Sequence, residues 1–214
     1  MNVAIIGVGY VGLVSGVCLA TKGHKVTCYD KNNSIIKKLN SGIPTIYEKG
    51  LSKLLKDVIK KNKFSATNNF IKAISDASII LIAVGTPPKQ NGSINLNNVI
   101  KVSKKIGHYI SSTKKFITVV VKSTVVPGST DTLVRKVIEK ASGKKLNEFG
   151  LGMNPEFLRE GSAIKDFMNP DRIVLGYEDE KTKKILIEIY KFWDCEKILV
   201  NTRTAELIKY TNNF

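Results

Sequence analysis

Apolar and polar residues alternate along this chain in blocks that predict strands separated by helices. Eight short runs rich in apolar residues fall at 2–8, 25–30, 64–68, 77–84, 116–124, 149–154, 171–177 and 197–202. Between them lie amphipathic segments edged with lysine, which are typical of helices. The runs AIIGV and IILIAV are apolar throughout, which suits parallel strands covered on both faces. The pattern predicts an α/β fold with a Rossmann-type, doubly wound, mostly parallel sheet and extra strands after the sixth.

A glycine-rich turn, GVGYVG, joins the first predicted strand to the first predicted helix. Gly7, Gly9 and Gly12 have the spacing at which glycines form a tight turn, let the backbone approach a pyrophosphate and let the helix pack closely on the strand. We therefore expect these glycines, with Tyr10 and Val11 between them, to bind a dinucleotide.

Asp30 ends the second predicted strand, eighteen residues beyond Gly12. A carboxylate at this place accepts hydrogen bonds from the ribose hydroxyls of adenosine and repels a 2′-phosphate. The sequence therefore predicts NAD as the cofactor in preference to NADP.

Hydroxyl side chains follow the fourth and fifth predicted strands. Thr86 lies in GTPP and Thr124 in KSTVVPGST, so both are expected at the carboxyl edge of the sheet, where ligands bind in such folds. Each could hydrogen-bond a ribose or a bound water, and each could equally cap the helix that follows. Ser129, near the end of KSTVVPGST, is expected to cap its helix.

The segment 154–172 is longer and more polar than an ordinary connection between a strand and a helix. Glu156 and Glu160 stand four residues apart within it. Because a general base must lie within hydrogen-bond reach of the proton that it takes, we expect these carboxylates near a substrate hydroxyl. His24 and His108 lie at the ends of predicted helices and are assigned structural or surface roles instead.

Lys209 and Asn213 lie four residues apart in the stretch TAELIKYTNNF, which places them on one face of a predicted helix. An ammonium and an amide on one face could point at a single oxygen atom. A lysine and an asparagine on a helix are, however, usually just solvated. Spacing alone leaves both alternatives open.

The composition excludes several other classes of protein. The net charge is +16, but only four of the 34 basic residues are arginines and the lysines are dispersed, which argues against a nucleic-acid groove. Cys18 and Cys28 are expected in the core, and with Cys195 they show no metal-ligand spacing and no even number for disulfides. We therefore expect no metal site. The longest apolar stretch is too short to span a membrane and the start lacks the features of a signal peptide, so we expect a cytoplasmic protein.

Six motifs occur together and in order over essentially the whole chain: GVGYVG, IPTIYEKGL, VGTPP, KSTVVPGST, NPEFLREGSAIKDFMNPDRIVLG and AELIKYTNN. In this combination the chain resembles the amino-terminal part of the UDP-glucose/GDP-mannose dehydrogenase family. The resemblance implies oxidation of a sugar C6 alcohol to a carboxylate in two hydride transfers to NAD. The NPDRIVLG and YEKGL stretches are more similar to members that use UDP-glucose, and enzymes for GDP-mannose or a UDP-N-acetylhexosamine are the alternatives.

The resemblance also implies roles for residues at the cofactor. Asp30 would hold the adenosine ribose, and Thr86 and Thr124 would contact the cofactor or a catalytic water. Glu156 would assist proton transfer near the nicotinamide.

For the substrate, the resemblance implies that Lys209 and Asn213 would stabilise the oxyanion that develops at C6. The sugar would contact the segment that contains Glu156, Phe157, Leu158, Arg159 and Glu160. The catalytic set implied in this way consists of Thr124, Glu156, Glu160, Lys209 and Asn213.

Two positions depart from the family pattern. Ile35 stands where a lysine usually follows the ribose-binding acid by five residues, and Lys49 stands where a proline is usual. One cofactor contact is therefore in question, and Lys31 is the residue that could replace it.

The resemblance implies a particular domain organisation. Residues 1–201 would form the NAD-binding domain, and residues 202–214 would begin a central helix through which family members dimerise. A second domain bearing a nucleophilic cysteine would follow, and no cysteine here has that setting. We therefore expect the chain to be an amino-terminal fragment that is inactive by itself, the alternative being a stand-alone dinucleotide-binding or regulatory module.

Overall fold

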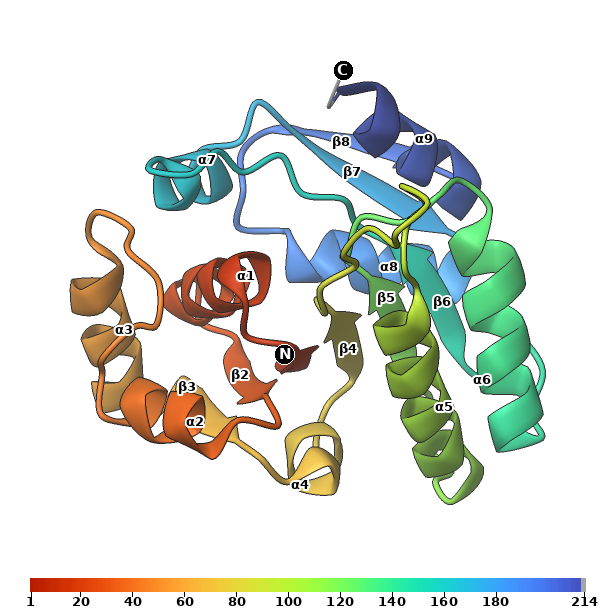
Figure 1. The fold of residues 1–214 in the computed structure, drawn as a ribbon, viewed down its shortest axis with the longest axis horizontal. Coiled ribbons are helices and arrows are strands. Elements are labelled where there is room, and N and C mark those ends of the chain that lie inside the picture. The colour runs from red at the N-terminus through yellow and green to blue at the C-terminus, as the bar shows by residue number, and fades with distance from the viewer. Residues whose placement is uncertain (213–214) are drawn as a thin grey trace.

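The computed structural model describes residues 1–212, in which strands and helices alternate along the chain (Figure 1). The strands are β1 (Asn2–Ile6), β2 (Lys25–Tyr29), β3 (Phe64–Thr67), β4 (Ile79–Ile82), β5 (Thr118–Val121), β6 (Gly150–Met153), β7 (Arg172–Tyr177) and β8 (Glu196–Val200). The helices are α1 (Tyr10–Thr21), α2 (Asn33–Asn40), α3 (Leu51–Lys60), α4 (Phe70–Ile74), α5 (Asn97–Ser111), α6 (Arg135–Ser142), α7 (Ala163–Met168), α8 (Glu180–Ile189) and α9 (Thr202–Asn212), with a π-helical turn, η1 (Ser129–Val134). Every predicted strand is confirmed.

The strands form one sheet in the order β3-β2-β1-β4-β5-β6-β7-β8. Neighbouring strands are parallel except β6 and β7, which are antiparallel. The chain winds outward from β1 to β3 and then outward in the opposite direction from β4, so the strand order reverses between β1 and β4. Open sheets of this kind bind ligands at such a reversal, outside the carboxyl ends of the strands. The predicted Rossmann-type sheet with extra strands is confirmed.

Helices cover both faces of the sheet, with α1 and α3 on one side and α5 and α6 on the other (Figure 1). Each face of the sheet packs against its helices in a separate hydrophobic core, the first under α1 and α3 and the second under α5 and α6. Successive side chains of a strand point to opposite faces, so Val3 and Ile5 join the first core and Ala4 and Ile6 join the second. Cys18 and Cys28 are fully buried in the first core, as predicted. Among residues 1–212, no helix is both long and apolar enough to cross a membrane.

A buried carboxylate fixes α9 to the loop that follows β5. Glu206 accepts hydrogen bonds from the backbone N–H groups of Gly128 (2.5 Å) and Thr130 (2.7 Å), at the amino-terminal end of η1. Burial raises the pKa of Glu206. The predicted cap by Ser129 is wrong, because its hydroxyl donates to the carbonyl of Val126 at 2.6 Å. The donors at the start of η1 are satisfied instead by α9, a helix distant in sequence.

His24 lies between α1 and β2 and is hydrogen-bonded within the protein. Its ring is buried, with Nε2 2.9 Å from the carbonyl oxygen of Ile189 and Nδ1 3.3 Å from the amino group of Met1. Burial lowers the pKa of this imidazole. His108 is exposed on α5. The placement of His24 agrees with the structural role assigned from the sequence, whereas His108 lies at the surface and also lines the cleft at the ends of β1, β2 and β4.

Candidate active site

The glycine-rich turn at the end of β1 has the geometry that a pyrophosphate requires. Gly7 has a φ of +100°, and a Cβ on Gly12 would lie 1.9 Å from the carbonyl oxygen of Gly7. Gly9 differs, because a Cβ there would meet no atom within 4 Å. Gly9 is also the N-cap of α1, and in the described part of the chain no side chain caps that helix. Open space beside Gly9 and the uncapped start of α1 fit an anionic group.

A cleft of about 640 Å³ opens beside this turn, at the ends of β1, β2 and β4. Asp30 lines it, and its carboxylate accepts hydrogen bonds from the backbone N–H groups of Val8 (3.3 Å) and Asn32 (2.9 Å). These bonds fix the carboxylate and leave lone pairs for the hydroxyls of a ligand. Lys31 lines the same cleft, whereas Ile35 packs against the core. The lysines of the cleft are Lys31, Lys101, Lys104 and Lys105.

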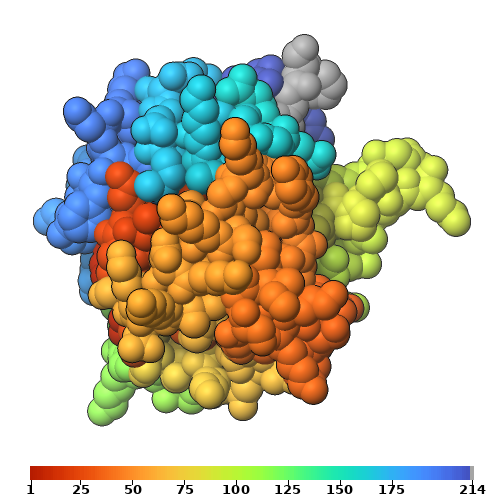
Figure 2. Space-filling view, turned by 90° about the vertical axis from the view of Figure 1, so that its left-hand side faces the viewer, coloured from red at the N-terminus to blue at the C-terminus, as the bar shows by residue number. Residues whose placement is uncertain are grey.

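The two predicted threonines are neighbours at the ends of β4 and β5. The hydroxyl of Thr86 donates to the backbone carbonyl of Thr124 at 2.9 Å. Neither threonine caps a helix, because η1 begins at Ser129 and α5 at Asn97. Between Thr86 and α5 the chain forms a loop, closed by a bridge between Pro88 and Ile94, that projects from the molecule (Figure 2, yellow-green).

The central contact of the site joins the loop after β6 to α9. A carboxylate oxygen of Glu156 lies 3.1 Å from Nζ of Lys209, and the two side chains are 12% and 9% exposed. The second oxygen of Glu156 accepts a hydrogen bond from the backbone N–H of Leu158 at 2.7 Å. Nζ of Lys209 also lies 5.5 Å from the ring centre of Phe157. Lys209 is thus buried and paired, so the solvated alternative is wrong for it, while Asn213 lies outside the described residues.

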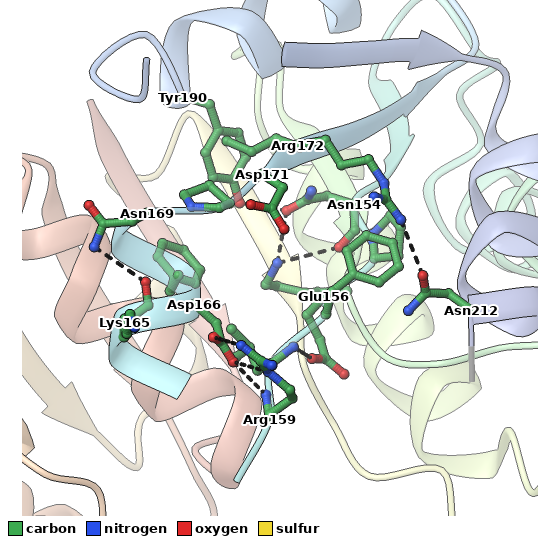
Figure 3. A pocket seen from close by; sticks show the side chains of 17 residues that line it. Asn154, Glu156, Arg159, Lys165, Asp166, Asn169, Asp171, Arg172, Tyr190 and Asn212 are labelled. Carbon is green, nitrogen blue, oxygen red and sulfur yellow. Dashed lines mark hydrogen bonds and ion pairs between the residues drawn. The ribbon is translucent and has the colours of Figure 1, made fainter. Parts of the chain in front are cut away.

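A cavity of about 520 Å³ lies behind this pair, between the loop after β6, α7 and β7 (Figure 3). Glu156, Phe157 and Leu158 line it, and the guanidinium of Arg172 stands 5.6 Å from the ring centre of Phe157. Arg172 also donates to the side-chain oxygen of Asn212 at 3.1 Å, which ties β7 to α9. The cavity therefore reaches from the sheet to the end of α9.

The two remaining residues of the predicted sugar-binding segment are exposed. Arg159 is turned toward α7, where its guanidinium donates to Asp166 at 2.7 and 3.2 Å. The hydrogen bond from Arg159 lowers the pKa of Asp166 to about 2. Glu160 is exposed at the tip of the loop. The structure thus brings Glu156, Phe157 and Lys209 together, and it pairs the side chain of Arg159 with Asp166 at the same cavity.

Sequence reasoning gave no role to a buried lysine at the floor of the cavity. Nζ of Lys122 donates to the side-chain oxygen of Asn154 at 2.9 Å, and the hydroxyl of Tyr190 donates to the same oxygen. The amide nitrogen of Asn154 in turn donates to the carbonyl of Val174 at 2.9 Å. Burial lowers the pKa of Lys122 to about 8, although the nearby Glu156 opposes the change. A lysine that ends the apolar run FITVVVK was the available signal.

The described residues contain no group of three or more His, Cys, Asp and Glu side chains that could hold a metal ion. Cys18 and Cys28 are buried, and burial raises the pKa of the Cys18 thiol to about 12. Cys195 is partly buried and its pKa is also raised by burial. A thiol with a raised pKa is a poor nucleophile, because the thiolate is the reactive form.

The sheet order, the glycine-rich turn and the acid at the end of β2 define a dinucleotide-binding domain of the Rossmann type. Residues 1–194 match the model of the UDP-glucose/GDP-mannose dehydrogenase family, NAD binding domain. The chain belongs to this family, as its NAD-binding domain, and NAD is its cofactor.

Relatives named for two different substrates have nearly the same sequence identity to this chain. The chain is 42% identical over 214 residues to the GDP-mannose 6-dehydrogenase of Pseudomonas aeruginosa, covering 100% of this chain and 49% of the relative. It is 41% identical over 212 residues to the UDP-glucose 6-dehydrogenase TuaD of Bacillus subtilis, covering 99% of this chain and 45% of the relative. The chain thus spans about half the length of the curated relatives it matches.

Solved structures show the same likeness. A ternary complex of GDP-mannose dehydrogenase from Pseudomonas aeruginosa matches with a TM-score of 0.97 and 42% identity, over 100% of this chain and 49% of that one. A UDP-glucose dehydrogenase from the archaeon Pyrobaculum islandicum matches with a TM-score of 0.94 and 42% identity, over 99% of this chain and 49% of that one. The family is therefore shown, and the comparisons do not separate the two sugars.

The lowered pKa of Lys122 predicts a pH-dependent term in stability. Between its folded value of about 8 and its ordinary value of 10.5, the unfolded chain keeps a proton that the folded chain releases, so this residue makes stability rise with pH. Relative to Lys122→Met, wild-type unfolding free energy should increase by up to about 3 kcal/mol between pH 7 and 10.5. Urea titrations at several pH values measure this difference.

Lys184, an exposed lysine of α8, gives the control. The difference between wild type and Lys184→Met should stay flat over the same range. A flat difference for Lys122→Met as well would contradict the buried, weakly basic lysine.

Proposed function

We propose that this domain serves a nucleotide-sugar dehydrogenase that oxidises the C6 alcohol of the sugar to a carboxylate. The observation that carries the proposal is the pair of Glu156 and Lys209 at the carboxyl edge of the sheet. Alcohol oxidation needs a group that takes the hydroxyl proton and a cation that stabilises the oxyanion, and these two side chains supply both. When NAD is bound, it accepts the hydride from the carbinol carbon.

Other residues are given roles in the same proposal. Thr86 and Thr124, which are hydrogen-bonded neighbours, would contact the cofactor or an ordered water. Glu160 would assist proton transfer, Asn213 would share the oxyanion with Lys209, and the stretch from Phe157 through Glu160 would contact the sugar. Family resemblance and the adjacent cavity support these roles.

Asp30 is proposed to select NAD over NADP. Its fixed carboxylate faces the cleft where an adenosine ribose would lie, and a 2′-phosphate there would meet a negative charge. Calorimetry on the 214-residue chain should give NADPH a dissociation constant at least about tenfold above that of NADH. In Asp30→Asn this ratio should fall toward one, and equal affinities in wild type would contradict the role of Asp30.

The second oxidation proceeds in this family through a thiohemiacetal and a thioester, and these require a thiolate nucleophile. Cys18, Cys28 and Cys195 all have raised pKa values and none lies in the site. We therefore propose that the nucleophile belongs to a second domain of the enzyme, and that the enzyme dimerises through α9. A cytoplasmic location remains a prediction from the sequence.

For the sugar, we propose UDP-glucose, which would be converted to UDP-glucuronate. The NPDRIVLG and YEKGL stretches support this choice. GDP-mannose is the second candidate, because the GDP-mannose 6-dehydrogenase of Pseudomonas aeruginosa is just as similar.

The test measures NADH formation by the protein purified from its native source. The assay contains NAD⁺ and either UDP-glucose or GDP-mannose. UDP-glucose should give two NADH per sugar, with kcat/KM at least about tenfold above that for GDP-mannose. The opposite order would assign GDP-mannose. The 214-residue chain should form no NADH. If the protein from its native source bound NADH but oxidised neither sugar, it would instead be a dinucleotide-binding module.

A further inference from the structure

A second buried carboxylate, outside the pair at α9, joins three distant segments of the chain. Glu48 lies in the loop between α2 and α3 and is only 5% exposed. It accepts a hydrogen bond from the hydroxyl of Tyr10. The same oxygen accepts one from the backbone N–H of Gly161 at 2.6 Å. The donors lie 38 and 113 positions away from Glu48, so the contact is purely tertiary.

Each segment that Glu48 joins belongs to a ligand site. Tyr10 directly follows Gly9 and is the first residue of α1, at the glycine-rich turn that we expect to bind the pyrophosphate. Gly161 directly follows the stretch that contains Glu156 and Glu160. Figure 2 shows the segment around residues 40–50 (orange) against that around residues 160–170 (cyan). The loop of Glu48 therefore bridges the cofactor turn and the proposed sugar-binding segment.

Separating Glu48 from its two donors would destabilise the folded chain. A buried carboxylate is costly unless hydrogen bonds replace its water, and here one donor comes from α1 and the other from the loop before α7. The hydroxyl of Tyr10 also lies 3.4 Å from the backbone carbonyl oxygen of Arg159, in the same segment as Gly161. Burial and the hydrogen bond to Glu48 both raise the pKa of Tyr10, so the phenol stays a donor. Movement of either segment would leave Glu48 with one donor.

We propose that Glu48 is a positioning residue that couples cofactor binding to the order of segment 156–162. A dinucleotide held at Gly9 restricts Tyr10, and through Glu48 it restricts the segment that carries Glu156. The inference rests on the proposed function for the sugar-facing role of that segment. The bridge itself stands on the hydrogen bonds alone.

Hydrogen exchange of the 214-residue chain, with and without NADH, tests the coupling. In wild type, NADH should slow exchange of the 156–162 amides by about tenfold. Tyr10→Phe keeps the ring and the bond between Glu48 and Gly161, so protection without NADH should persist while the effect of NADH disappears. Glu48→Ala should lose both, and Glu48→Gln, whose amide oxygen still accepts, should keep part of each.

The control is Lys49→Ala, an exposed neighbour, which should exchange like wild type. Calorimetry should show NADH binding within about threefold of wild type in the two Glu48 variants and in Lys49→Ala, whereas a general structural defect would weaken binding in the Glu48 variants. Exchange of Tyr10→Phe is measured at an NADH concentration that saturates this variant, so that any change in its own affinity for NADH does not enter the comparison. If NADH protected segment 156–162 equally in Tyr10→Phe and wild type, the proposal would be overturned. If wild type bound no NADH, the cofactor assignment would fail, and unchanged exchange in Glu48→Ala would separately refute the bridge.

Discussion

The ion pair between Glu156 and Lys209 is the contact on which the proposed active site depends. It joins the loop after β6 to α9, which follows the last strand of the sheet. A charge buried to this extent needs its partner, because removing one member leaves the other uncompensated. The pair therefore fixes how far apart the end of β6 and α9 can lie. Glu156 also lines the cavity that Phe157 and Arg172 line, so the pair stands at the wall of that cavity.

The change of strand direction between β6 and β7 makes this contact possible. Strand β7 runs antiparallel to β6, and only its last two residues, Gly176 and Tyr177, lie opposite the end of β6. Strand β8 runs parallel to β7 with Val200 opposite Gly176, so β8 ends level with the carboxyl end of β6 and the chain enters α9 there. Glu206 then locks α9 by accepting the backbone donors at the start of η1. One turn further along α9, Lys209 meets Glu156. The same helix thus carries an anchor and a cation that faces the site.

The proposed dinucleotide cleft is lined by residues from the amino-terminal part of the chain. The order of the strands reverses between β1 and β4, and the cleft lined by Gly9 and Asp30 lies at that reversal. Glu48 connects this cleft to the segment that carries Glu156. Through Glu48, the loop between α2 and α3 contacts both the start of α1 and the loop before α7.

The sequence predicted much of this fold because its signals are local. Apolar runs identify all eight strands, and the spacing of Gly7, Gly9 and Gly12 identifies the turn. The contacts that it could not predict are tertiary. Nothing around Glu48 or Glu206 marks a buried acid, because their donors lie far away in sequence.

The same limit applies within the candidate site. The fork between Arg159 and Asp166 depends on how α7 folds back over the loop after β6, which no local pattern encodes. The sequence predicts Lys209 on a helix, and α9 confirms this. Its burial and its partner required the structure.

A double-mutant cycle on Glu156→Gln and Lys209→Met tests the central claim most directly. Unfolding free energies of the two single variants and the double variant should give a coupling of about 1 kcal/mol or more, because the pair is buried and close. The matched control is the exposed pair of Glu188 and Lys191, 2.6 Å apart and about half exposed, whose coupling should stay below about 0.5 kcal/mol. A coupling near zero for Glu156 and Lys209 would contradict the account.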